Sequence, residues 1–249
     1  MQDQTGVDLD FETLSFRWGL EHVNPNEEAW IEIQQVIKSI TRNDVVSKQL
    51  QNFYNWQEEL INPSTGKVVS PPIGGQTVLN QVISDKFSKN LGWEEQIYVL
   101  NQSNEILESE RVPYWTMDFR KNQIGLGISF NNAGVFAQNL LRLSVMSESK
   151  FLRKEEMIKL GVLVVSMKSL KKWSTMDSTV ITFDQVQTII PHITFSIPTP
   201  IIIIGISDSN DGVKWKPTKL FGNKKIGSYK GSKQSHWDQL IMEEKKSLA

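Results

Sequence analysis

The chain has 249 residues, 39% of them apolar and 22% charged, and its net charge of −1 gives no sign of a general attraction to nucleic acid. It contains no cysteine, which excludes disulfides, zinc–thiolate sites and thiol nucleophiles and fits a reducing cytoplasm. The longest apolar run, at 201–204, is far shorter than a membrane-spanning helix, and the N-terminus lacks the pattern of a secretory signal. We therefore expect a soluble, cytoplasmic protein with no membrane association.

The N-terminal part of the chain is predicted to be largely helical. Residues 1–16 are acidic and only weakly periodic, and we expect a loose arm there. Apolar residues three and four apart predict one helix that begins after residues 24–26 and a second that is capped by the pair Asn43-Asp44. A loop at 62–75, with paired prolines and paired glycines, precedes a third helix through 78–87.

The middle of the chain is predicted to alternate between strands and helices. The continuous β-branched runs at 161–165 and 201–206 are typical of strands that are buried on both faces of a sheet. The order of elements predicts an α/β fold with a mixed β-sheet and flanking helices. In chain order, we expect strands at 97–100, 112–119 and 124–130, a helix at 135–145, a strand at 161–165, helices at 167–173 and 183–190, and a strand at 201–206.

We expect a single domain over residues 1–249. Its first part, 1–90, is helical, and the core follows at 93–207. A C-terminal extension at 208–249 is polar, basic and rich in glycine, and ends in a charged helix at 236–246.

The most informative stretch is 115–132, which is predicted to form two strands joined by a short polar turn. Asp118 lies at the end of the first strand, where an acid is most often a turn or capping residue. In the second strand Gly127 and Ser129 share a face, because residues two apart point the same way. Hydrolysis of a phosphodiester commonly uses Mg²⁺, which prefers oxygen ligands. For such a site a second acid is expected at Gly127, and the carbonyl of Ile128 also lies within reach.

The hairpin reads Asp118-Phe119-x-Lys121-Asn122-x-Ile124-Gly125-x-Gly127-Ile128-Ser129-Phe130-Asn131. This order resembles the core of the BglII/BamHI-like type II restriction endonucleases, which belong to the PD-(D/E)xK nuclease superfamily. A helix and two buried strands follow in the family's order, and the resemblance covers about residues 60–207. It implies a restriction-endonuclease-like fold and a homodimer that clasps double-stranded DNA. It also implies Mg²⁺-dependent cleavage at a short palindrome.

The resemblance assigns roles by position. Asp118 is the metal-binding acid, Ile128 supplies a carbonyl ligand, and Ser129 stands where an activating or water-orienting side chain belongs. Gly127 stands where the family has glutamate, so the metal site lacks one carboxylate. The loss of one of two such carboxylates is expected to cost orders of magnitude in rate.

Further contacts are assigned on the same basis, each beside a plainer alternative. Asn131 and Asn132 begin a helix, and they either face a phosphate or simply cap the helix. Three acids upstream either add a ligand or belong to a solvated loop, namely Glu105, Glu108 and Glu110. The C-terminal lysines suit a loop along a phosphate backbone, and equally a solvated charged surface. Those assigned to DNA binding are Lys214, Lys216, Lys219, Lys224, Lys225 and Lys230.

Two explanations of Gly127 stay open. The chain is either a natural inactive relative or a nuclease disarmed by an introduced substitution, and we slightly favour the second because the rest of the hairpin is so well kept. The leading functional hypothesis is thus a type II restriction endonuclease in a catalytically impaired form. The alternatives are a non-cleaving DNA-binding protein on the same scaffold, and an α/β interaction domain whose hairpin matches by accident.

Overall fold

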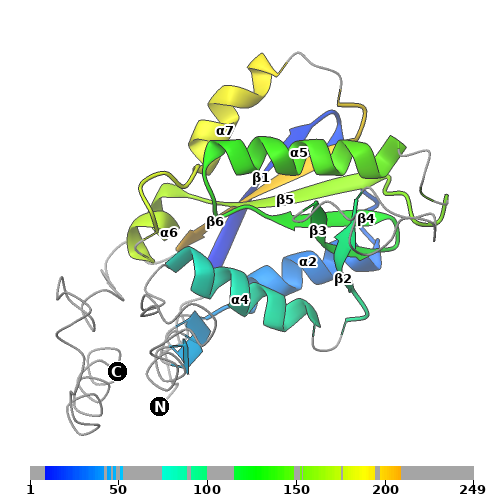
Figure 1. The fold of residues 1–249 in the computed structure, drawn as a ribbon. Helices are drawn as coiled ribbons and strands as arrows, with labels where there is room; N and C mark the ends of the chain where they lie inside the picture. The colour runs from blue at the N-terminus through cyan, green and yellow to red at the C-terminus, as the bar shows by residue number, and fades with distance from the viewer. Residues whose placement is uncertain are drawn as a thin grey trace, which may run out of the picture.

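The computed structural model contains a mixed six-stranded β-sheet with helices on both faces (Figure 1). Across the sheet the strands lie in the order β1-β6-β5-β4-β3-β2. The three central strands β6, β5 and β4 are parallel, and β1, β3 and β2 pair antiparallel at the edges. The strands are β1 (Leu9–Phe16), β2 (Glu94–Tyr98), β3 (Thr116–Lys121), β4 (Ile124–Ile128), β5 (Leu160–Ser166) and β6 (Ile201–Asp208). The structure describes residues 9–41, 44–45, 47–48, 51–52, 75–88, 91–99, 115–148, 152, 154–174, 176–193 and 197–208.

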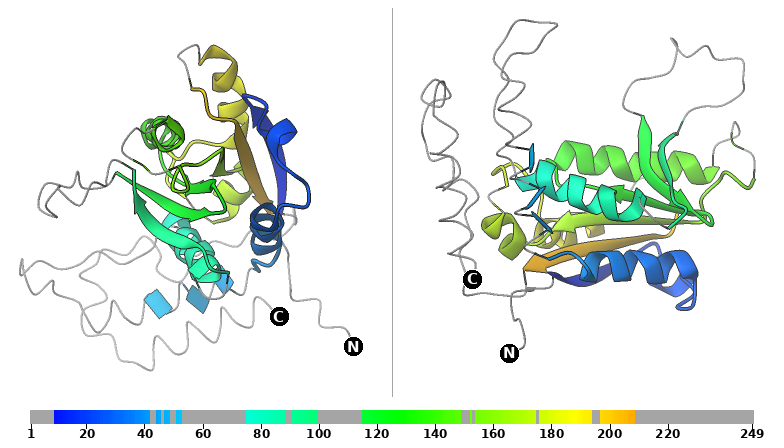
Figure 2. Two further views of the ribbon diagram at one scale, coloured as in Figure 1. Left: turned by 90° about the vertical axis from the view of Figure 1, so that its right-hand side faces the viewer. Right: turned by 90° about the horizontal axis from the view of Figure 1, so that it is seen from below.

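The helices form a layer on each side of the sheet (Figure 2). On one side lie α5 (Ala133–Glu148) and α7 (Phe183–Ile189), and on the other α2 (Glu28–Lys38) and α4 (Gly75–Ser88). The shorter helical elements are α1 (Gly19–His22), α6 (Lys168–Trp173) and the 3₁₀ turn η2 (Ile190–His192). None of the described helices combines the length and apolarity needed to cross a membrane.

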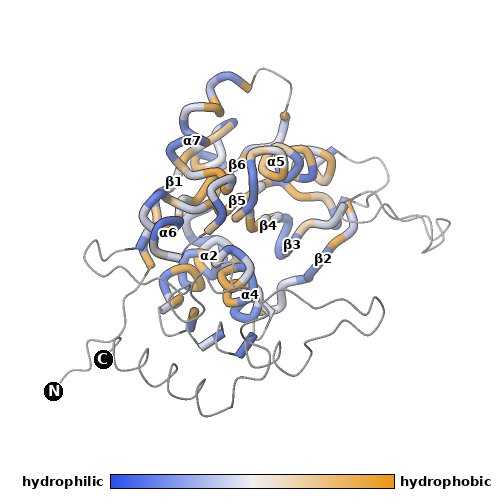
Figure 3. The backbone as a smooth tube through the Cα atoms, turned by 60° about the vertical axis from the view of Figure 1, so that its left-hand side comes forward, coloured by the Kyte–Doolittle hydropathy of each residue, from blue (hydrophilic) through white to orange (hydrophobic). Residues whose placement is uncertain are grey.

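Strand β5 contributes alternate side chains to the two hydrophobic cores, one on each face of the sheet. Val162 and Val164 pack into the core under α2 and α4, whereas Leu163 and Val165 pack into the core under α5 and α7. All seven residues of β5 are buried. Figure 3 shows the hydrophobic segments concentrated where the central strands lie between the helices. Burial on both faces explains why this strand reads as an uninterrupted apolar run rather than as an alternating one.

The predicted α/β class, the mixed sheet and most of the elements are confirmed. Helices α2, α4, α5, α6 and α7 and strands β5 and β6 lie where the patterns place them. At the start of the second predicted helix Asp44 takes part in a reciprocal cap with Thr41. Asp44 Oδ2 accepts from the Thr41 N–H at 2.9 Å and the Thr41 hydroxyl accepts from the Asp44 N–H at 3.2 Å, while Asn43 lies outside the described residues. That helix beyond residue 52, the loop at 62–74 and the C-terminal extension from 209 lie outside the described residues.

The expectation of a loose arm at 1–16 is wrong for its second half. Leu9–Phe16 forms the edge strand β1, which pairs antiparallel with β6 from Leu9↔Asp208 to Phe16↔Ile201. As an edge strand it exposes its acids Asp10 and Glu12, a common device against edge-to-edge association. The pattern is therefore weak locally, and the partner that stabilises the strand lies near the other end of the described chain.

The turn between β3 and β4 is tighter than the predicted four-residue turn. Only Asn122 and Gln123 connect the strands, and both have positive φ values of 48° and 65°. Such left-handed pairs match the twist of a two-residue hairpin. Helix α2 supports this end of the hairpin, because Lys121 Nζ lies 2.7 Å from Glu32 Oε1 and Glu32 Oε2 accepts from Trp93 Nε1 at 2.9 Å.

Helix α5 packs closely on the sheet because β5 has a glycine beneath it. A Cβ atom at Gly161 would lie 2.7 Å from Leu143 Cδ1, so a larger residue there would force the Leu143 side chain to move. The apolar face of α5 is completed by Phe136, Leu140 and Met146, which are all buried. This contact fixes the distance and rotation of α5 relative to β3 and β4.

We predict that the buried carboxylate of Glu32 stabilises the fold through the hairpin. Glu32→Ala leaves Trp93 Nε1 without its partner and takes the nearer carboxylate from Lys121, which keeps the Leu91 carbonyl and Glu28. It should lower the free energy of unfolding by about 1–3 kcal/mol. Glu28→Ala is the matched control, because the Glu28 side chain is 68% exposed and its contact with Lys121 is 3.4 Å long. It should cost less than about 1 kcal/mol. Equal losses in urea denaturation of the two variants would contradict the prediction.

Candidate active site

The hairpin brings Asp118 and Gly127 close together. The paired residues of β3 and β4 end at Phe119 and Leu126, and Asp118 and Gly127 are the next residue on each strand. A Cβ atom built on Gly127 would lie 4.0 Å from Asp118 Oδ2. A side chain at 127 would therefore project toward the carboxylate.

Asp118 is a half-buried carboxylate with few partners among the described residues. Its Oδ2 accepts a hydrogen bond from the backbone N–H of Ile128 at 2.6 Å. Burial raises the pKa of Asp118 above its ordinary value, although the Ile128 bond, the positive charge of Arg142 and the Gln96 side chain act in the opposite direction. The site thus holds an acid whose charged form is only partly compensated.

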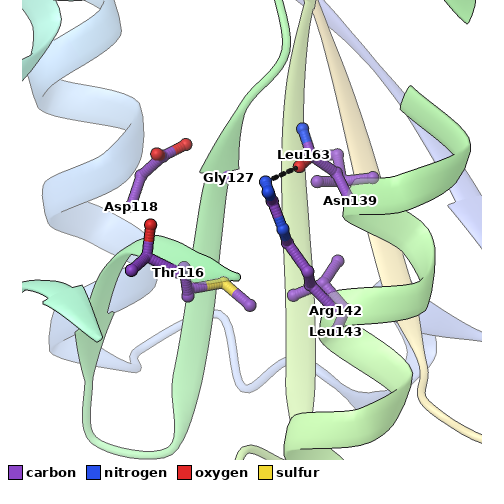
Figure 4. Close-up of a pocket in the computed structure, with 8 residues that line it drawn as sticks. Thr116, Asp118, Gly127, Asn139, Arg142, Leu143 and Leu163 are labelled. Carbon is purple, nitrogen blue, oxygen red and sulfur yellow. Dashed lines mark hydrogen bonds between the residues drawn. The ribbon is translucent and has the colours of Figure 1, made fainter. Parts of the chain in front are cut away.

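Helix α5 brings two polar residues to this carboxylate. Arg142 Nη1 donates to Asn139 Oδ1 at 2.7 Å, and Figure 4 shows both side chains between the helix and the hairpin. Asn139 is only 6% exposed although it sits on the same helix face as Phe136 and Leu140. A polar residue on a buried face needs a partner, and Asn139 finds it in Arg142.

These residues surround a cleft of about 270 Å³ at the hairpin. A much smaller void of about 10 Å³, bordered by Asp118, Gly127, Arg142 and Leu163, lies where a side chain at 127 would begin, and is large enough for a single water. The cleft is lined by Asn80 and Ser84 from α4, Gln96 from β2, Asp118, Ile128 and Asn131 from the hairpin and its end, and Val135, Asn139 and Arg142 from α5.

The family described as restriction endonuclease BglII/BglIII matches residues 11–206, which span the sheet from β1 to β6. The chain belongs to this family. The match begins much earlier in the chain than the resemblance at 60–207, since it includes β1 and α2. The hairpin is thus part of a restriction-endonuclease family fold.

Two solved structures are similar to this one. BglII bound to a DNA 16-mer is 14% identical, with 82% of this chain and 78% of that chain covered and a TM-score of 0.48. Free BglII is 13% identical, with 82% of each chain covered and a TM-score of 0.44. A comparison with curated proteins gave no match.

The predicted site residues of this BglII-family chain, Ser129 apart, separate into three groups. Asp118, Ile128 and Asn131 line the cleft, and Gly127 borders the adjoining void. Asn132 acts as the helix cap, because its Oδ1 accepts from the Val135 N–H at 3.1 Å. Outside the described residues lie the acids and lysines Glu105, Glu108, Glu110, Lys214, Lys216, Lys219, Lys224, Lys225 and Lys230.

Ser129 does not line the cleft. It is completely buried, and its Oγ has no hydrogen-bond partner among the described residues. Its backbone N–H donates to the Val164 carbonyl at 2.8 Å, which holds the end of β4 against β5.

Arg142 and Asn139 are the residues that sequence reasoning missed. The sequence does carry a signal for Asn139, because positions 136, 140 and 143 form an apolar helix face on which residue 139 also falls. Nothing in the linear pattern marks Arg142, whose meeting with Asp118 depends on the packing of α5 against the sheet.

The described residues do not fit a divalent metal ion in this form of the site. Within that part of the chain no three His, Cys, Asp or Glu residues come together as a metal-binding group. Asp118 is the one acid among the residues that line the cleft, its Oδ2 is already an acceptor, and the cation Arg142 shares the space. A hard cation such as Mg²⁺ needs more negative oxygen than this arrangement provides.

We predict that Asp118→Asn stabilises the protein near neutral pH. The raised pKa means that the native state binds more protons than the unfolded state between the two pKa values, so stability falls as pH rises through that window. Asparagine has the same shape, stays neutral, and keeps an oxygen for the Ile128 N–H.

The gain in the free energy of unfolding should be about 0.5–2 kcal/mol, as is common when a strained functional residue is replaced. It should shrink at acidic pH, where Asp118 itself is protonated. Urea denaturation at both pH values checks this, and a variant less stable than the parent at neutral pH would count against the prediction.

Proposed function

We propose that the chain is a type II restriction endonuclease that acts on double-stranded DNA at a short palindromic site, and that its present form cleaves poorly or not at all. Family membership supports the nuclease assignment. The impairment is supported by Gly127, which lies beside Asp118 and has no side chain to place next to it. In the family-like site two acids face each other across this pair and share the cofactor, Mg²⁺. Here one of the two positions has no side chain.

The remaining residues still suit binding of DNA. The cleft has amide and hydroxyl groups from Asn80, Ser84 and Asn131, which can donate to phosphate oxygens. The lysines proposed for phosphate contact, 214 to 230, belong to the C-terminal extension outside the described residues. A palindromic target calls for two-fold symmetry, so we propose a homodimer on DNA.

A non-cleaving, sequence-specific DNA-binding protein is the second candidate. It is favoured by the same defect, because a scaffold without its second acid can keep DNA recognition after losing cleavage. The two candidates differ in whether the other residues of the site can still support DNA cleavage once an acid is restored at position 127.

We predict that Gly127→Glu restores DNA cleavage with Mg²⁺. The new Cβ lies 4.0 Å from Asp118 Oδ2, and the atom it meets too closely is the flexible end of Leu163, at 2.9 Å. The rate should rise by roughly two to three orders of magnitude over the parent, the usual effect of one group in a catalytic site. Mixed plasmid and phage DNA, which offer many candidate sequences, should give discrete fragments.

Gly127→Gln is the matched control, because it fills the same space without a charge and should remain inactive. Asp118→Asn in the Gly127→Glu background should abolish the restored cleavage. If Gly127→Glu binds DNA but stays inactive with Mg²⁺ and with Mn²⁺, the result contradicts the impaired endonuclease and supports the non-cleaving DNA-binding protein. If the parent binds no DNA even at low salt, both candidates are wrong.

A further inference from the structure

Arg142 is the one described residue of the cleft lining that carries a positive charge. Its guanidinium borders both the cleft and the small void at Gly127, so it stands beside the position that lacks an acid. Figure 4 shows Arg142 reaching from α5 toward β4. The cation therefore occupies the part of the site where a carboxylate and its metal ion would otherwise meet.

The guanidinium is held in place rather than left to solvent. Asn139 Oδ1 accepts from Arg142 Nη1 at 2.7 Å, and Asn139 itself is almost completely buried under α5. A guanidinium has five N–H donors in a rigid plane, so it can bind an anion through two of them while another fixes its orientation. Arginine in this setting is suited to a planar, bidentate contact with a phosphate group.

The charge balance of the cleft favours the same ligand. Among the described residues, its lining contains one acid, Asp118, and one base, Arg142, while the other polar residues are amides and a hydroxyl. The formal charge of these described residues is thus zero, whereas a second acid at 127 would make it negative. A negative cleft repels a DNA phosphate unless a cation enters with it, and a neutral cleft with many donors does not.

We propose that Arg142, positioned by Asn139, binds a DNA phosphate in this cleft directly, so that DNA binding by this chain does not require a divalent metal ion. This inference rests on the proposed function, because it takes DNA to be the ligand of the cleft. It assigns the cleft of the present form to phosphate binding by protein groups alone.

The test measures binding rather than cleavage. The probe is a fluorescent duplex recovered by selection on the full-length chain from a random pool, titrated in EDTA and in Ca²⁺, which supports binding without catalysis. The parent should bind equally well in both buffers. Arg142→Ala should weaken binding about tenfold or more, and should lower the slope of log K against log salt by about one for each protomer.

Three variants separate positioning from folding and from general charge. Arg142→Lys keeps the charge without the planar fork and should fall between the parent and Arg142→Ala. Asn139→Ala should weaken binding by a smaller factor, because it frees the guanidinium without removing it. Lys38→Ala removes one exposed positive charge at the end of α2, where Lys38 stacks over Phe11 with 5.5 Å from its Nζ to the ring centroid, and should bind like the parent.

The outcomes also distinguish this inference from the proposed function. Gly127→Glu should bind more tightly in Ca²⁺ than in EDTA, because its second acid makes the cleft depend on a cation. Tenfold stronger binding of the parent in Ca²⁺, or parental affinity in correctly folded Arg142→Ala and Arg142→Lys, would overturn the role of Arg142 alone. Absence of DNA binding in both buffers would overturn the proposed function and this inference with it.

Discussion

The antiparallel pairing of β3 with β4 decides which groups can meet at the site. Side chains alternate along a strand, so a shift of one residue would turn Asp118 away from position 127 and bury it among apolar side chains. The two-residue turn at Asn122 and Gln123 allows only one register, and the ion pair of Lys121 with Glu32 holds the turn against α2. The chemistry of the cleft therefore depends on contacts at the opposite end of the hairpin.

The second constraint is the position of α5, which supplies the other half of the cleft. Phe136, Leu140, Leu143 and Met146 are buried beneath this helix, and each contributes roughly 1.5–3 kcal/mol. One buried polar group costs about 1–3 kcal/mol when it lacks a partner. The apolar contacts together outweigh that cost several times, so the helix can carry Asn139 on its buried face. Because Asn139 is hydrogen-bonded to Arg142, the packing also fixes where the guanidinium points.

The extent to which the sequence predicts this structure depends on the range of each interaction. The runs at 161–165 and 201–206 predict buried strands, because almost every residue in them is apolar and is buried in the structure. Strand β1 is missed because it is stabilised by β6, nearly two hundred residues away, and its own acids face solvent. The hairpin strands are likewise visible in the sequence, but their register depends on the two-residue turn, where a longer turn is predicted. Arg142 reaches Asp118 only through the packing of two layers. Periodicity therefore predicts the strands, but neither their exact register nor the contacts between layers.

The residue at position 127 affects both metal binding and the charge around Arg142. A glutamate there would supply a metal ligand, but it would also add a negative charge next to Arg142, which would then have a second carboxylate to neutralise. The same substitution thus makes hydrolysis feasible and makes phosphate binding depend on a cation. In the glycine form Asp118 is the one acid among the described residues of the cleft lining, and burial raises its pKa, so its ionised form is weakly stabilised. A phosphate diester remains ionised at any physiological pH, so it keeps its charge beside the guanidinium, and no acid at position 127 repels it.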